Sequence, residues 1–153
     1  MKAPIPPFSF DTATQKVRMA ENIWNGRNPD IVVLAYSENT YWRNRDQFIS
    51  GREQAHAFLT QKWTKEREYK LIKELWSYNN DVIAVRFAYE WHDDMQQWWR
   101  SYGNENWKFD AQGYMTHRYA SINDVAILKE DRLFLWEGDN RPDDYSGLTK
   151  LGL

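Results

Sequence analysis

Charged side chains alternate with tryptophans along three consecutive stretches between Val82 and Asp124. Glu105 stands two residues before Trp107, and Arg118 and Asp124 occupy even positions of the third stretch. Because alternate residues of a β-strand point to the same face, these charges share one face of a predicted sheet with large aromatic rings. A carboxylate or guanidinium buried on that face costs free energy unless it is paired, hydrogen-bonded or used. The pattern therefore predicts a polar site in an aromatic pocket.

Glu105 is the candidate catalytic residue, as a general acid or base. Desolvation among aromatic rings raises the pKa of a carboxyl group, whereas a cation within about 4–6 Å lowers it, so the two effects compete here. Arg118 is suited to hold a carboxylate, enolate or phosphate group of a ligand through paired hydrogen bonds. The further candidate ligand-binding residues on this face are Tyr89, Trp91, Trp107 and Asp124.

A purely structural interpretation of the same residues stays open beside the functional one. Glu105 and Arg118 are expected to be cross-strand neighbours, and a buried pair of this kind can satisfy itself. Asp124 at the end of a strand is typical of a turn cap. The aromatic residues serve a core as readily as a pocket. The sequence does not decide between a site and a structural pair.

Composition restricts the classes of function. The 153 residues carry a formal net charge of −2 at pH 7 and include no cysteine. This balance offers no field for a nucleic-acid backbone or an anionic membrane surface, and thiolate chemistry and cysteine-ligated metals are excluded. The three histidines show no metal-ligand spacing. We therefore expect no nucleic acid, membrane, metal or cofactor, and a cytoplasmic location, because residues 1–10 contain no apolar leader.

Two hydrophobic periods divide the chain. A period of 3.6 residues predicts helices at residues 12–25, 29–36 and 50–63, with capping boxes at Thr12–Gln15 and Ser50–Glu53. The period then changes to 2, which predicts strands at residues 69–78, 82–91, 98–109 and 115–124, after an earlier strand within residues 39–49. The connecting segments are rich in Asn, Asp and Gly and suit hairpin turns.

This order of elements predicts the α+β class, with three N-terminal helices packed in the concave face of a curved, mostly antiparallel sheet. The space between the helices and the sheet is where a ligand pocket is expected. We predict one domain over residues 1–153, with a core at about 10–136 and an irregular tail at residues 137–153.

Several motifs of this layout resemble the nuclear transport factor 2-like superfamily. They are Trp24-Asn25-Gly26 at a helix end, Ser50-Gly51-Arg52-Glu53 at a helix start, and Asn106-Trp107-Lys108-Phe109-Asp110 followed by Gly113-Tyr114-Met115. More narrowly, residues 100–107 and the ending Arg141-Pro142-Asp143-Asp144 resemble the SnoaL-like group known as domain of unknown function 1348. The resemblance spans the whole chain. It implies a cone-shaped, cystatin-like α+β barrel that forms a homodimer through the outer face of its sheet, and it implies no named activity.

The ketosteroid isomerases of this superfamily suggest one more candidate residue. Counting without gaps from Asn25-Gly26 places their general-base aspartate on Arg43 and their oxyanion-hole tyrosine on Met19, while their second oxyanion-hole acid falls on Glu105. Because arginine cannot accept a proton near neutral pH, their mechanism is not expected here. Arg43 instead becomes a candidate ligand-binding residue that converges with Glu105 and Arg118.

Two functions from different classes follow. The first is a SnoaL-like protein that binds a small acidic or aromatic molecule in an internal pocket, with any catalysis a cofactor-free isomerase, lyase or hydratase step through Glu105. The second is a non-catalytic ligand-binding or dimerisation module in which the charges are structural. A pocket of about 300 Å³ or more beside Glu105 favours the first, and a closed interior with Glu105 fully paired favours the second.

Overall fold

The computed structural model describes residues 1–153 and begins with the predicted helices. Helix α1 spans Phe10–Asn25, α2 spans Pro29–Val32 and runs into the 3-10 helix η1 at Val33–Ala35, and α3 spans Gly51–Lys65. None of the helices is both long and apolar enough to cross a membrane.

The starts of α1 and α3 differ from the predicted capping boxes. Ser9, not Thr12, is the N-cap of α1: its hydroxyl accepts from the N–H of Thr12 at 3.2 Å, and the Thr12 hydroxyl accepts from the N–H of Ser9 at 2.8 Å. The Ser50 side chain makes no capping hydrogen bond, and the Gln54 side chain accepts from the Ser50 N–H at 2.8 Å instead. Both predicted boxes were therefore wrong, because Ser9 and Gln54 are better placed to satisfy the free N–H groups.

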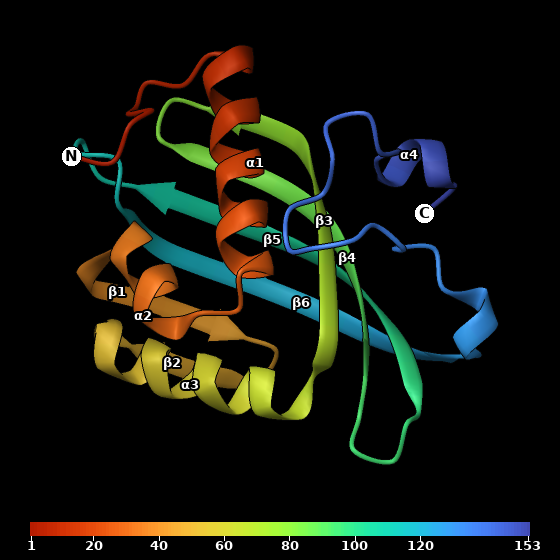
Figure 1. Ribbon diagram of the computed structural model, residues 1–153. Helices are drawn as coiled ribbons and strands as arrows, with labels where there is room; N and C mark the ends of the chain where they lie inside the picture. The colour runs from red at the N-terminus through yellow and green to blue at the C-terminus, as the bar shows by residue number, and fades with distance from the viewer.

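Six strands form one curved sheet (Figure 1). They are β1 (Tyr36–Asn44), β2 (Gln47–Ser50), β3 (Arg67–Asn79), β4 (Val82–His92), β5 (Trp98–Phe109) and β6 (Met115–Ile127). Their order is β2-β1-β6-β5-β4-β3, and all neighbours are antiparallel except β1 and β6, which are parallel. The helices lie over the concave face, so the predicted α+β cone with a mostly antiparallel sheet is confirmed.

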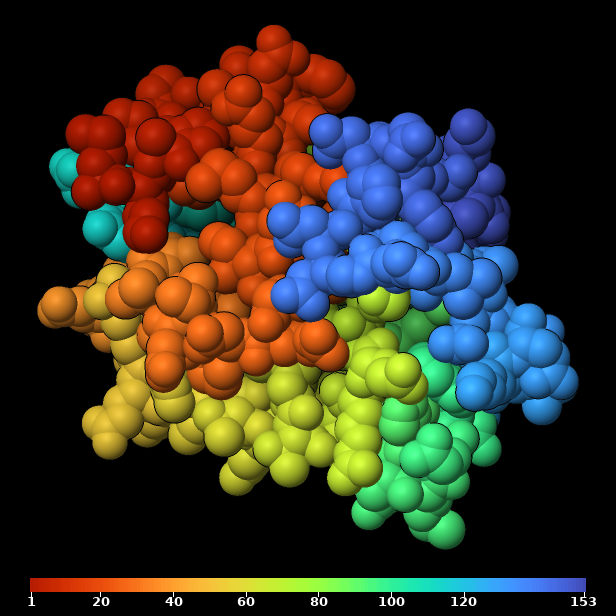
Figure 2. All heavy atoms as spheres, viewed as in Figure 1, coloured from red at the N-terminus to blue at the C-terminus, as the bar shows by residue number.

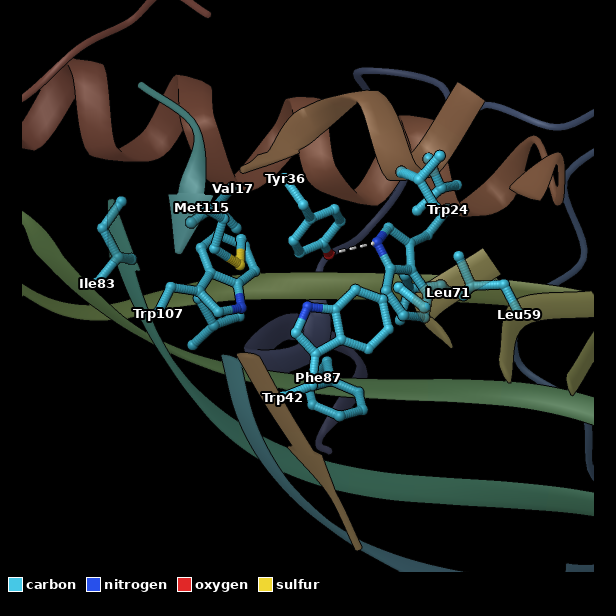
Figure 3. Packing of buried hydrophobic residues seen from close by; sticks show 14 of the residues in the cluster. Val17, Trp24, Tyr36, Trp42, Leu59, Leu71, Ile83, Phe87, Trp107 and Met115 are labelled. Carbon is cyan, nitrogen blue, oxygen red and sulfur yellow. Dashed lines mark hydrogen bonds between the residues drawn. The ribbon is translucent and has the colours of Figure 1, made fainter. Parts of the chain in front are cut away.

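The inner face of the sheet is the one that the alternation of residues predicted. Glu105 of β5 is opposite Val85 of β4 and Ala120 of β6, and Trp107 is opposite Arg118. All five side chains are buried. A single cluster of 21 buried hydrophobic residues joins this face to the helices, and Figure 3 shows its tryptophan and tyrosine rings packed together.

Side chains of α1 take the place of a neighbouring strand along the edge of β3. The Asn25 amide donates to the carbonyl oxygen of Leu71 at 2.9 Å and accepts from its N–H at 2.8 Å. The buried Glu21 carboxylate accepts from the N–H of Lys73 at 2.8 Å. Because buried backbone groups need partners, these bonds set the position of α1 over the sheet.

The C-terminal segment folds back onto the outer face of the sheet and passes beside α1 (Figures 1 and 2). It contains the 3-10 helix η2 (Lys129–Asp131) and a short helix α4 (Leu148–Leu151). Phe134, Trp136 and Leu148 form a second apolar cluster with Ile72 and Ala88 of the sheet. The chain itself therefore covers the outer face of β3 and β4.

Two buried carboxylates fix this segment in place. Glu90 of β4 accepts from the N–H of Phe134 and from Nε of Arg100, both at 2.9 Å. Glu21 of α1 accepts two hydrogen bonds from the Arg141 guanidinium, at 3.0 and 3.1 Å. Because each carboxylate accepts charge-assisted hydrogen bonds in a buried place, the tail is part of the folded unit.

Candidate functional site

Glu105 is paired with two cations on the inner face of the sheet. Its Oε2 accepts from Nε of Arg118 at 2.9 Å, and its Oε1 accepts from Nζ of Lys73. The side chain of Glu105 is fully buried, and those of Lys73 and Arg118 are 3% exposed. We call these three residues the charged cluster. The structure thus brings together the predicted pair and adds a second cation.

Aromatic rings and one amide surround the two cations. The Arg118 guanidinium lies 4.8 Å from the ring centroid of Trp24 and 5.1 Å from that of Trp42, and it donates to Oδ1 of Asn44 at 3.0 Å. Nζ of Lys73 lies 5.7 Å from the ring centroid of Trp24. These cation–π contacts and the amide replace part of the hydration that the charges lose on burial.

The protonation of the charged cluster follows from competing effects. Burial raises the pKa of Glu105, but the adjacent Lys73 and Arg118 outweigh it, and the pKa lies below its ordinary value. Burial lowers the pKa of Lys73, and the attraction of Glu105 offsets this only in part. Glu105 is therefore an ionised partner of two donors near neutral pH, and not a proton donor.

Lys73 was missed in the sequence. It lies between Leu71 and Leu75 on β3, and that alternation was the available signal for an inward side chain. Glu74 and Trp76 point the other way: the Glu74 side chain is 27% exposed, and Trp76 is 72% exposed. A lysine in a polar stretch is most often exposed to solvent. The residue type therefore suggested an outward side chain, although the position of Lys73 in the strand indicated an inward one.

Arg43 lies on the opposite face of β1 from the charged cluster. Its Nη1 donates to the backbone carbonyl oxygens of Arg45 at 2.8 Å and Ala120 at 3.1 Å. The buried neighbours Trp42 and Asn44 are the inward residues of this strand. The structure therefore corrects the expected convergence of Arg43 with the cluster, because counting without gaps was out of phase with the alternation of β1.

Three other predicted ligand-binding residues form a separate polar group. Oδ1 of Asp124 accepts from Nη2 of Arg45 at 2.7 Å and from the Ser101 hydroxyl at 2.6 Å. The indole N–H of Trp91 donates to the same Ser101 hydroxyl at 2.9 Å, and the Tyr89 hydroxyl lies 3.5 Å from Nη2 of Arg45. This group fastens the turn between β1 and β2 to the sheet.

A largely apolar cavity of about 320 Å³ lies between α1, the α2–η1 segment and the sheet. Eleven of its 13 lining residues are hydrophobic, namely Met19, Ala20, Ile23, Trp24, Ile31, Leu34, Ala35, Tyr36, Trp107, Phe109 and Met115. Met19, Ile31 and Leu34 are 41–53% exposed and mark its opening, whereas Tyr36 and Trp107 are buried at its inner end.

Trp107 separates this cavity from the charged cluster. Its ring lines the cavity, and the ring centroid lies 5.3 Å from Nζ of Lys73. No residue of the charged cluster lines the cavity. Of the predicted site residues, only Trp107 does.

Two lysines near the N-terminus complete the cavity wall. Nζ of Lys16 donates to the carbonyl oxygens of Lys2 and Gly113, each at 2.7 Å. Burial, followed by the charge of Lys2, lowers the pKa of Lys16 to about 8. Gly113 has a φ of +86°, and a Cβ there would overlap the carbonyl group of Lys2, so glycine lets the N-terminal arm lie against the β5–β6 turn (Figure 2).

The charged cluster and the cavity offer different chemistry. Both oxygens of Glu105 already accept hydrogen bonds from cations, so proton transfer through it requires an ion pair to open. The cavity offers apolar walls and a few buried N–H and O–H groups. No group of three or more His, Cys, Asp or Glu side chains gathers in a metal-binding arrangement. The arrangement favours binding of a small molecule over acid–base chemistry at Glu105.

Solved structures of the same fold cover about three quarters of the chain. The epoxide hydrolase/cyclase-like enzyme SalBIII, from pyran ring formation in the polyether salinomycin, is 14% identical with a TM-score of 0.66, over 74% of this chain and 92% of its own. An NTF2-like protein of unknown function from Exiguobacterium sp. 255-15 is 14% identical with a TM-score of 0.61, over 74% and 100%. RV0760c from Mycobacterium tuberculosis, in complex with estradiol-17beta-hemisuccinate, is 15% identical with a TM-score of 0.60, over 72% and 91%.

At these identities the structural likeness establishes the NTF2-like, SnoaL-like fold. No curated protein matches the sequence. One family model matches residues 6–135, which include all six strands and helices α1 to α3. The chain therefore belongs to the family described as protein of unknown function DUF1348.

Proposed function

We propose that the protein binds a small, largely apolar molecule in the cavity between α1 and the sheet. The observation that carries the proposal is an apolar cavity of about 320 Å³ whose opening is edged by Met19, Ile31 and Leu34, all exposed. Ligand sites are typically apolar hollows of roughly 300–1,000 Å³ with few polar groups. Exposed apolar side chains around a hollow are costly in water and favour a ligand that covers them.

The size of the cavity limits the ligand to one or two fused rings or an equivalent aliphatic body. RV0760c, of the same fold, was solved with estradiol-17beta-hemisuccinate, a molecule with an apolar ring system and an acidic end. That complex supports an apolar ligand for this fold.

We infer that Glu105 supports the site and does not transfer protons in it. Lys73 and Arg118 occupy both of its oxygens, and Trp107 stands between them and the cavity. A cofactor-free isomerase, lyase or hydratase step through Glu105 would need this arrangement to open first. The proposal thus combines an internal ligand site with a structural role for the charges.

We also propose that two copies associate through the part of the outer face that the C-terminal segment leaves uncovered. Phe48 and Tyr119 are 66% and 38% exposed there, and a hollow of about 500 Å³ lies beside Tyr119, His117 and Asn106. Exposed aromatic residues are enriched in interface cores. Sedimentation of the wild type and of Tyr119→Glu tests this: the wild type sediments as a dimer and the variant as a monomer, and a monomeric wild type would exclude the dimer.

Filling the cavity tests the ligand site. In Ala20→Trp an indole occupies the space beside Ile23, and the matched control Gln15→Trp puts the same side chain on the exposed side of α1. Isopropenylnaphthalene, an apolar compound of suitable size, is expected to raise the melting temperature of the wild type and of Gln15→Trp, because it binds only the folded state. Ala20→Trp is expected to show no rise.

Two results would contradict the ligand site. One is the absence of any ligand-dependent rise in the wild type across a range of aromatic and aliphatic compounds. The other is an equal rise in Ala20→Trp, which would place the bound compound elsewhere. Circular dichroism of both tryptophan variants checks that they are folded.

A further inference from the structure

The Tyr36 hydroxyl at the inner end of the cavity has a hydrogen that no group accepts. Tyr36 stands where η1 passes into β1, and its side chain is buried. Its oxygen accepts from the indole N–H of Trp24 at 3.1 Å, as the dashed line in Figure 3 marks. That bond uses a lone pair of the oxygen and leaves the O–H hydrogen as a free donor.

One further donor near Tyr36 is also unused, since the indole N–H of Trp42 has no hydrogen-bond partner. The indole N–H of Trp107, whose ring lines the same cavity, lies beside the Glu105 carboxylate and helps to lower its pKa. The rings of Trp42 and Tyr36 are 4.7 Å apart, and Figure 3 shows Tyr36 between Trp107 and Trp24. Buried donors are nearly always paired in folded proteins, so unpaired donors in one place call for an acceptor.

The acceptor that suits this place carries no charge. The only charged side chains that line the cavity are Lys2 and Lys16, and Nζ of Lys16 already donates to two carbonyl oxygens at its rim. No cation lines the inner end at Trp24, Tyr36 and Trp107, because Arg118 and Lys73 lie behind the rings of Trp24 and Trp107 and are already paired with Glu105. An ionised group there would lose its hydration without direct contact with a counter-ion, whereas a neutral oxygen needs only a hydrogen bond.

We propose that Tyr36 is the specificity-determining residue of the cavity, and that its hydroxyl donates a hydrogen bond to a neutral carbonyl oxygen of the ligand. The ligand is an apolar ketone or ester whose carbonyl group enters first and whose hydrocarbon body lies against Met19, Ile31 and Leu34. The inference rests on the proposed function, since it assigns the polar contact of the same cavity.

The surroundings of Tyr36 suit it for this task. Burial raises the pKa of its phenol group, and the charge of Arg118 offsets part of that rise. The group therefore stays protonated at all physiological pH values, and the nearby cation strengthens its O–H as a donor. The Trp24 N–H restricts the rotation of the hydroxyl by occupying one side of its oxygen.

Three compounds of one shape test the contact. Acetylnaphthalene, isopropenylnaphthalene and naphthoate, all substituted at the same ring position, present a neutral carbonyl, no acceptor and a carboxylate. Calorimetry of the wild type is expected to give the ketone about five- to tenfold tighter binding than the alkene, as for one hydrogen bond between neutral groups. Naphthoate is expected to bind most weakly.

The variant Tyr36→Phe, which lacks only the phenol oxygen, tests whether Tyr36 makes the contact. In Tyr36→Phe the ketone is expected to bind no more tightly than the alkene, while Tyr41→Phe, a matched change on the outer side of the same strand, keeps the preference. The ratio of the two affinities is the quantity compared, because any effect of the lost Trp24 partner falls on both compounds. Infrared spectra provide a second readout: the carbonyl stretch of the bound ketone is expected at lower frequency in the wild type and Tyr41→Phe than in Tyr36→Phe.

The outcomes distinguish a failure of the Tyr36 contact from a failure of the ligand site itself. Equal binding of ketone and alkene by the wild type would overturn the role of Tyr36 and leave the apolar site intact. Tightest binding of naphthoate would overturn the neutral acceptor in favour of an anion. No binding of any of the three compounds would contradict the proposed function and this inference together.

Discussion

The charged cluster and the cavity lie on two sides of Trp107, and they differ in whether their polar groups have hydrogen-bond partners. In the cluster, both oxygens of Glu105 accept hydrogen bonds from Lys73 and Arg118. In the cavity, the Tyr36 hydroxyl keeps a hydrogen that no group accepts. A fully paired group has nothing left for a ligand, whereas an unpaired buried donor is costly until a ligand arrives.

The conspicuous charges and the candidate binding groups of this protein are therefore different residues. Burial of a charge on the inner face costs desolvation free energy, which makes such residues stand out in the sequence. Ion pairing within the protein already compensates this cost. Neutral donors such as Tyr36 cost less and stand out less. We therefore expect substitutions in the cluster to change the stability of the fold, and substitutions in the cavity to change ligand affinity.

The largest effect is expected from Glu105→Gln. Loss of the carboxylate leaves Lys73 and Arg118 buried without a counter-ion, so the free energy of unfolding should fall by about 3–5 kcal/mol. Urea denaturation measures the fall, and Glu38→Gln, on an exposed glutamate without an ion-pair partner, is the matched control with a change below about 0.5 kcal/mol. Full stability of Glu105→Gln combined with lost ligand binding would reverse the assignment of the two regions.

A smaller loss of stability is expected from Lys73→Met. The methionine keeps most of the apolar stem, and Arg118 still neutralises Glu105, so the loss should be about 1–3 kcal/mol, the cost of one unmet acceptor. Burial already lowers the pKa of Lys73, which makes its charge the more dispensable one. The same urea titrations rank the two variants. If Lys73→Met were the more damaging, the pairing of Glu105 would depend on lysine and not on arginine.

Lys16, at the rim of the cavity, should make the free energy of unfolding depend on pH. The pKa of Lys16 is about 8 in the folded protein, against 10.5 for an ordinary lysine. Between these values the unfolded chain keeps a proton that the folded protein has released, so the free energy of unfolding rises with pH. The wild type should therefore gain stability relative to Lys16→Met between pH 8 and 10.5, and show a constant difference below pH 8. A difference that stays flat or falls across this window would show that Lys16 titrates normally.

The smallest effect is expected from Arg43→Ala. Its guanidinium bonds backbone carbonyl groups on the outer face of β1, so its loss should change stability by no more than about 1 kcal/mol. Ligand affinity should not change, because Arg43 reaches neither the cluster nor the cavity. Calorimetry with acetylnaphthalene measures this, and a clear loss of affinity would return Arg43 to the site.

Much of the fold was predictable because strand alternation is a strict geometric rule. The parity of β4 to β6 predicted that Glu105 and Arg118 face inward, and the change of hydrophobic period predicted helices followed by a meander. Arg43 failed because positions carried over from distant relatives do not respect the phase of a strand. Lys73 was missed because its residue type suggested solvent while its neighbours suggested the core.

The free O–H hydrogen of Tyr36 could not be predicted from the sequence, for a different reason. Whether a hydroxyl hydrogen is free depends on which groups surround it, and here Trp24 approaches the oxygen from another element of the fold. The C-terminal segment posed the same difficulty. The composition of residues 137–153 suggested an irregular tail, and only the arrangement in space shows Leu148 of this tail packed with Phe134 and Trp136 on the sheet.

The hydrogen bonds between Glu21 and Arg141 join residues that are 120 positions apart, which matters while the chain is being synthesised. Helix α1 leaves the ribosome 120 residues ahead of Arg141, so its buried Glu21 carboxylate has no arginine partner until that part of the chain has emerged. Contacts between residues so distant in sequence form late, because a long loop has to close first. The helix that forms one wall of the cavity therefore reaches its final position only after Arg141 has been synthesised, and the cavity wall is complete no earlier.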